Sequence, residues 1–118
     1  MPSQPAELRE RTKQFAIRIV KLFRALPRTE EARVIGKQVL RSGTSVAANY
    51  RAVCRSRSRA DFISKLTVVT EETDETVFWL ELLVETGIVR EVQLEKLLTE
   101  ANELIRIFGS SLHTAKSK

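Results

Sequence analysis

The chain has 118 residues, of which 42% are hydrophobic and 30% are charged, and its formal net charge is +5. This balance excludes a disordered chain and predicts one globular domain over residues 1–118. No apolar run approaches the roughly 20 residues needed to cross a bilayer. The N-terminus also lacks the apolar segment of a secretory signal. With one cysteine, an internal disulfide is excluded, and we expect a cytoplasmic protein without a membrane partner.

The first predicted helix runs from about residue 5 to about residue 26. Its apolar residues recur at helical spacing, and basic residues occupy much of the remaining surface. Ser3 is the expected N-cap. Pro27 ends the helix, because the residue before a proline is pushed out of the α region.

The second predicted helix runs from about residue 30 to about residue 56, with Thr29 as its N-cap. Its inner face is unusually small and polar for a core, which predicts close packing against another backbone. Asn49 lies on that face and would need a hydrogen-bond partner if buried. The residues assigned to this close-packing seam are Ser42, Gly43, Ser45, Ala47 and Ala48.

The third predicted helix runs from about residue 59 to about residue 86. Ser58 and Asp61 resemble a capping box at its start, and Gly87 is a favourable residue for its end. One apolar stripe of this helix is assigned to the core: Phe62, Leu66, Val69, Thr73, Val77, Leu80 and Val84. A second apolar patch lies on the opposite side of the same helix: Val68, Phe78, Trp79 and Leu82. One bundle covers one face of a helix, so the second patch predicts a subunit interface in a homo-oligomer.

The fourth predicted helix covers residues of about 90–112, and the polar tail after it is expected to fray. Short loops between long helices force consecutive helices to pack antiparallel. The fold class predicted from these elements is therefore all-α, as an antiparallel up-down-up-down four-helix bundle.

Three short patterns occur between Gln38 and Leu83. Ser45, Val46 and Asn49 form a Ser-Val/Ile-x-x-Asn segment, and Glu75 supplies an acid in the middle of the third helix. An Arg-Ser-x-x-acid-Phe helix start is formed by Arg57, Ser58, Asp61 and Phe62. With these patterns the chain resembles the four-helix-bundle proteins related to those encoded within intervening sequences of bacterial 23S ribosomal RNA genes. Two departures from the family pattern are Ala52-Val53 in place of Glu-Gly and Glu71-Glu72 in place of Gly-Ser.

The resemblance implies a left-handed antiparallel bundle that assembles into a ring, with a homopentamer as the expected form. The architecture is also similar to that of the accessory proteins of diversity-generating retroelements. Those proteins are basic pentameric barrels that contact nucleic acid and a reverse transcriptase. The resemblance thus informs the expected assembly more than any activity.

A basic cluster follows the seam: Arg51, Arg55, Arg57 and Arg59. Clustered guanidinium groups can bind phosphate oxygens without reading bases. Tyr50 is the one aromatic residue among them, so base stacking is poorly supported. The alternative is that these arginines pair, within the subunit or across an interface, with the acidic cluster Glu71, Glu72, Asp74 and Glu75.

Catalytic patterns are weak in this chain. The acidic cluster lacks the Glu-x-x-His motifs of a di-metal bundle, and the single histidine is His113, near the C-terminus. Cys54 has no histidine nearby in sequence to activate it. We therefore expect no enzyme, no cofactor, no metal and no small-molecule substrate. The expected function is a homo-oligomeric scaffold or adaptor that binds RNA or a ribonucleoprotein; the alternative is a protein–protein assembly that binds no nucleic acid.

Overall fold

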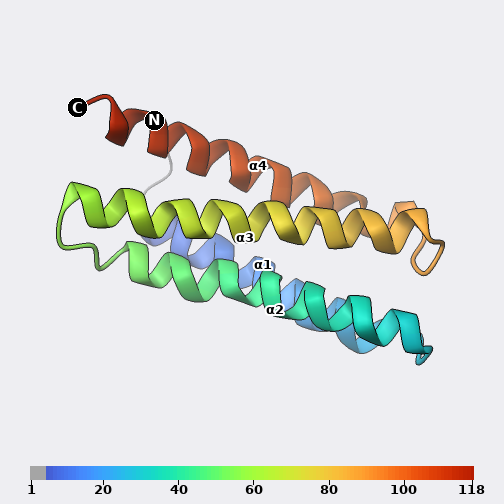
Figure 1. Ribbon diagram of the computed structural model, residues 1–118. Coiled ribbons are helices and arrows are strands. Elements are labelled where there is room, and N and C mark those ends of the chain that lie inside the picture. Colours follow the sequence, from blue (N-terminus) through green and yellow to red (C-terminus); the bar gives the residue numbers. More distant parts are fainter. Residues whose placement is uncertain (1–4) are drawn as a thin grey trace.

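The computed structural model describes residues 5–118, which form four helices and no strand. The helices are α1 (Pro5–Ala25), α2 (Glu30–Val53), α3 (Arg59–Glu85) and α4 (Glu91–Lys116). Consecutive helices alternate in direction, and the molecule is elongated, with extents of 48 × 21 × 20 Å (Figure 1). The prediction of an all-α four-helix bundle is thereby confirmed. The N-cap predicted at Ser3 lies outside the described residues.

Side-chain caps explain where α2 and α3 begin. The Thr29 hydroxyl accepts a hydrogen bond from the backbone N–H of Ala32, and the Ser58 hydroxyl accepts one from the N–H of Asp61. Both predicted N-caps are confirmed. The capping box at Ser58 differs in one respect, because the Asp61 carboxylate accepts from the N–H of Arg57, at 3.1 Å, and not from that of Ser58.

Gly87 ends α3 in the way predicted. Its φ of +76° is a left-handed conformation, which glycine adopts without steric cost. Its N–H bonds to the carbonyl of Val84, and the N–H of Ile88 bonds to that of Leu83, both at 3.0 Å. This pair of bonds is a Schellman motif, which satisfies two carbonyl groups of the last helical turn.

Two helix ends differ from the prediction. Helix α2 stops at Val53, about three residues early, because the N–H groups of Arg55 and Ser56 bond three residues back in a tighter turn. Helix α4 continues to Lys116, although the tail was expected to fray. Leu112 packs against the core, and Ala115 in the added turn is half-buried, which stabilises this turn as helix.

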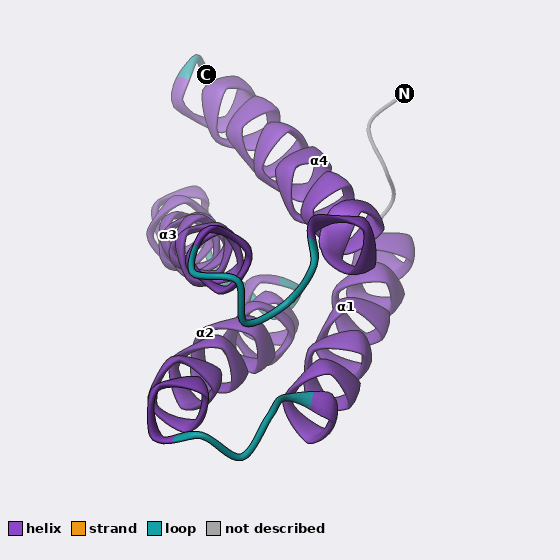
Figure 2. Cartoon of the chain, turned by 90° about the vertical axis from the view of Figure 1, so that its right-hand side faces the viewer, coloured by secondary structure: helices purple, strands orange, loops and turns teal. Residues whose placement is uncertain are grey.

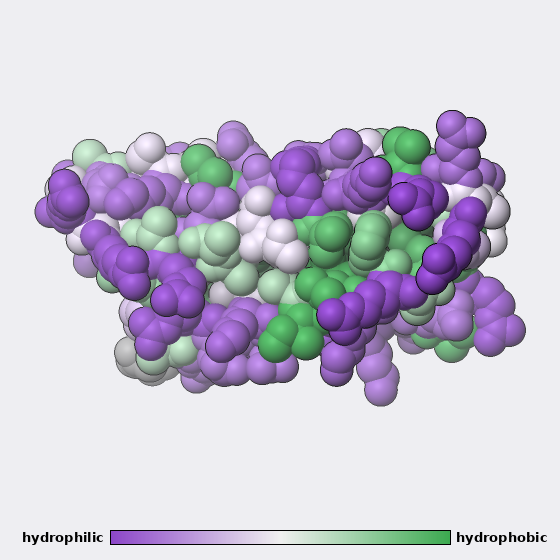
Figure 3. Space-filling model, turned by 90° about the horizontal axis from the view of Figure 1, so that it is seen from below, coloured by the Kyte–Doolittle hydropathy of each residue, from purple (hydrophilic) through white to green (hydrophobic). Residues whose placement is uncertain are grey.

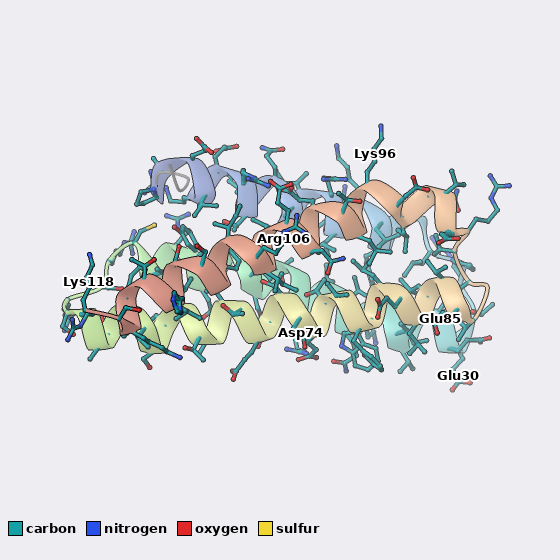
Figure 4. The ribbon with its side chains drawn as sticks, turned by 90° about the horizontal axis from the view of Figure 1, so that it is seen from above. Glu30, Asp74, Glu85, Lys96, Arg106 and Lys118 are labelled. Atoms are coloured by element: carbon teal, nitrogen blue, oxygen red, sulfur yellow. The ribbon has the colours of Figure 1, made fainter. Side chains whose placement is uncertain are left out.

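The four helices are not equivalent in their packing. Helix α2 packs between α1 and α3, and α4 packs mainly on α3. Figures 2 and 4 show the reason: α4 starts beside the C-terminal end of α1 and crosses obliquely towards the first turns of α3. Arg11 joins α1 to α4 through Glu100, at 2.7 Å, and Glu103, at 3.0 Å. The hydrogen bond that Arg11 donates to Glu100 raises the pKa of Arg11 above its ordinary value.

The core stripe predicted for α3 is buried or half-buried throughout, and Thr76 and Leu83 are buried in addition. The Thr76 hydroxyl donates to the Ser42 hydroxyl on α2 at 2.9 Å. Because both groups are fully buried, this bond satisfies a polar pair inside an apolar core. The sequence pattern identified Ser42 but not its partner.

The close-packing seam on α2 is narrower than predicted. Ser42 and Gly43 are buried, but Ala48 is exposed. A Cβ atom added at Gly43 would lie 2.7 Å from Cγ1 of Ile19 on α1, so the glycine is required there. Asn49 donates to the Ser45 carbonyl of its own helix at 2.8 Å and makes no hydrogen bond to another helix.

Candidate nucleic-acid interface

A groove of about 620 Å³ runs between the first half of α1 and the last turns of α2. Its lining consists of small residues and charged side chains: Arg9, Glu10, Lys13, Thr44, Ala47, Ala48, Arg51, Cys54 and Arg55. The small side chains let solvent approach the helix surfaces between the longer charged ones. Figure 3 views the molecule from the α2 side and shows pale and apolar residues along the long axis, bordered by hydrophilic side chains.

Helix geometry brings four cations to this groove. Arg9 and Lys13 are four residues apart on α1, so they project from the same side of that helix. Arg51 lies in the last turn of α2 and Arg55 in the turn that follows. All four side chains are exposed, and within the described part of the chain none forms an ion pair. The one acid in the lining, Glu10, accepts a hydrogen bond from Gln14 at 2.8 Å.

The other two arginines of the predicted cluster lie elsewhere. Arg57 is in the α2–α3 turn, where its backbone N–H donates a hydrogen bond to the Asp61 carboxylate. The pKa of Asp61 lies below its usual value, chiefly because its carboxylate accepts a hydrogen bond from Lys65 and secondly because it accepts this N–H. Arg59 begins α3 and donates to the backbone carbonyl of Lys118. It lines a separate cavity of about 790 Å³ between the start of α3 and the end of α4. The structure therefore brings together Arg51 and Arg55, but not all four.

The acidic cluster of α3 has a partner that the sequence pattern did not identify. Arg41 on α2 forms ion pairs with Glu72, at 3.3 Å, and with Glu75. Glu75 also accepts a hydrogen bond from the Trp79 indole at 2.9 Å. Among residues 5–118, none of the four clustered arginines pairs with these acids. Glu71 and Asp74 are exposed.

The residues of the second apolar patch of α3 differ in how far they are buried. Phe78 is 53% exposed and Val68 41% exposed, so both face outwards. Trp79 and Leu82 are half-buried, and Trp79 packs against the core. The rings of Phe78 and Trp79 meet edge to face with centroids 4.9 Å apart. The outermost member of the patch is thus Phe78.

Over residues 5–118, no three side chains of His, Cys, Asp or Glu are grouped as a metal site would require. Cys54 is a free, exposed thiol at the edge of the groove. Across the same residues, no helix has both the length and the apolar character that a membrane span needs.

The chain is similar to proteins of one family. A family model described as 23S rRNA-intervening sequence protein matches residues 5–110. A crystal structure from Bacteroides thetaiotaomicron, of a protein with unknown function from the S23 ribosomal protein family, is 37% identical. That match covers 92% of this chain and 97% of the other, with a TM-score of 0.86. No curated protein matches the chain. With nearly all of its described helical residues inside the family model, the chain belongs to the 23S rRNA-intervening sequence protein family.

Proposed function

We propose that this protein is a non-enzymatic, homo-oligomeric scaffold or adaptor of the cytoplasm that binds RNA through the α1–α2 groove. The observation that carries the RNA-binding part is the set of four exposed cations, Arg9, Lys13, Arg51 and Arg55, none of which forms an ion pair among residues 5–118. Guanidinium and ammonium groups bind the phosphate oxygens of a nucleic-acid backbone.

The groove favours binding without base readout. Its lining contains no aromatic residue on which a base could stack. Tyr50, the nearest aromatic residue in sequence, is buried and stacks on Phe108 with ring centroids 5.7 Å apart. Binding is therefore proposed to depend steeply on salt and weakly on sequence.

The assembly part of the proposal rests on the outer face of α3. Phe78 and Val68 expose apolar surface on a helix whose opposite stripe is already buried. Such surface is typical of a protein interface. The left-handed bundle and the ring of five subunits remain part of this proposal, and they rest on the family resemblance.

RNA binding is tested by fluorescence anisotropy with a labelled single-stranded RNA over a series of salt concentrations. Replacing both Arg51 and Arg55 by Gln removes two phosphate contacts, so affinity should fall about tenfold or more and the salt slope should decrease by about two. The matched control is Arg106→Gln, which removes an exposed cation of α4 remote from the groove (Figure 4). Absence of RNA and DNA binding by the wild type at low salt would overturn this half of the proposal and leave the protein–protein assembly as the function.

Assembly is tested by native mass spectrometry of the wild type and of Phe78→Asp. The substitution removes the exposed aromatic ring from the proposed interface and puts a solvated carboxylate in its place, while removing little buried contact within the subunit, so smaller species with unchanged helicity are expected. Val92→Asp is the control, because Val92 is 67% exposed on α4 and away from the patch. A monomeric wild type would contradict the proposed assembly.

A further inference from the structure

Two helices of this chain present apolar residues surrounded by charges of opposite sign. On α3, the exposed Phe78 is surrounded along the helix by acids: Glu71, Asp74, Glu81 and Glu85. The stretch 66–85 contains no basic residue at all. On α1, Ile17 is 37% exposed, and its neighbours Arg18, Lys21 and Arg24 are exposed bases. We call these the acidic face of α3 and the basic face of α1.

The two faces cannot meet inside one subunit. Helices α1 and α3 lie diagonally in the bundle and do not pack on each other, because α2 and α4 separate them. Figure 2 shows them on opposite sides of the end-on view, and Figure 4 shows them along opposite edges, with Asp74 on the α3 side. The acidic side chains therefore point away from the basic face of their own subunit.

We infer that the acidic face of α3 in one copy docks on the basic face of α1 in the next copy. The inference rests on the proposed assembly and names the two surfaces that form it. Phe78 and Ile17 supply apolar contact, and the opposite charges around them provide complementarity. Pairing two α3 faces would bring like charges together, and so would pairing two α1 faces.

A head-to-tail contact has a consequence for the form of the assembly. Each subunit uses two different surfaces, so the contact repeats until the rotation closes into a ring. A two-fold dimer, in which one surface meets its own copy, is not expected. Arg51 in α2 and Arg55 in the turn that follows it lie in neither face, so RNA binding and assembly can be disrupted separately.

The test reverses the charges of each face separately and then together. Changing all four acids, Glu71, Asp74, Glu81 and Glu85, to Lys makes the α3 face basic. Changing all three bases, Arg18, Lys21 and Arg24, to Glu makes the α1 face acidic. Either set alone places like charges in the contact, so the subunit concentration for half-assembly should rise about tenfold or more. Both sets in one chain restore opposite signs, and the subunit number of the wild type should return. Circular dichroism of every variant verifies that the helices are intact.

A reversal on α4, Glu91→Lys with Glu95→Lys, is the matched control and should leave assembly unchanged, since both side chains are exposed outside the two faces. If the two single-face variants dissociate and the combined variant stays dissociated, the α1–α3 pairing is wrong. If neither variant affects a wild type that assembles, the inference fails and the proposed assembly stands on another surface. A wild type that is monomeric overturns both.

Discussion

Among the glycines of the bundle, Gly43 has the most crowded surroundings for an added methyl group, and Gly43→Ala measures the cost of that crowding. In an exposed helix the change would stabilise by about 1 kcal/mol, because alanine has the higher helix propensity. Here the new Cβ would lie 2.7 Å from Cγ1 and 2.8 Å from Cγ2 of Ile19. Both atoms are bonded to the same Cβ atom, so no rotation about χ1 moves both away. Ile19 is fully buried and has no free space to enter.

Overpacking of this kind costs about 1–3 kcal/mol. The close contact with both branches places Gly43 towards the upper end, so after the propensity gain we expect a net loss of about 1–2 kcal/mol. For a chain of this size the melting temperature should fall by about 3–8 °C. Urea denaturation followed by circular dichroism measures the free energy of unfolding directly.

Gly109→Ala is the matched control. Gly109 lies inside α4 with nothing within 4 Å of an added Cβ, so this variant should be about 1 kcal/mol more stable than the wild type. On an Ile19→Ala background the clashing atoms are absent, and Gly43→Ala should then no longer destabilise. A Gly43→Ala protein as stable as the wild type, measured beside a stabilised Gly109→Ala, would refute the reasoning.

Two further variants and one titration of the wild type test hydrogen bonds and titrating groups. Ser42→Ala removes the acceptor for Thr76, whose single hydroxyl proton can then be donated to the Glu72 carbonyl instead. A loss of about 0.5–1.5 kcal/mol is therefore expected in urea denaturation, and a loss above about 3 kcal/mol would contradict this. Burial raises the pKa of Tyr50 to about 12, so stability should be full below about pH 10 and decrease as the pH rises towards 12. Absorbance of the chain's single tyrosine reports this titration, and an ordinary pKa near 10 would refute it. The pKa of Asp61 is lowered in the folded protein, so the stability that its carboxylate contributes is present above about pH 4 and is lost as the pH falls. Asp61→Asn should therefore lower the free energy of unfolding at neutral pH but hardly at pH 2–3. An equal loss of stability at both pH values would contradict the assignment.

Local signals in the sequence predicted the helices and most of their ends. Thr29, Ser58 and Gly87 act through hydrogen bonds and backbone angles of near neighbours, so their roles follow from the sequence without knowledge of the tertiary structure. The C-terminal end of α4 could not be predicted in this way. Its last turn packs half-buried side chains on the bundle, and that depends on the oblique path of the helix.

The candidate site was predicted in part. The spacing of Arg51 and Arg55 indicated a basic surface, but an uninterrupted helical repeat would also have included Arg59, and the end of α2 at Val53 directs that residue elsewhere. Arg9 and Lys13 line the same groove from α1, although both lie more than 35 residues before Arg51 in the sequence. Arg41 was missed for the same reason, because its pairing with Glu72 depends on the relative position of α2 and α3 along their axes.

The uneven packing of the helices also determines how the chain folds. Well-packed helix pairs are neighbours in sequence, and the one contact between the chain's first and last helices is slight. Folding therefore requires little closure of long loops, which is the condition for rapid folding. The α2–α3 hairpin is the unit on which the outer helices assemble, so its amides should exchange with deuterium last and those of α1 and α4 earlier.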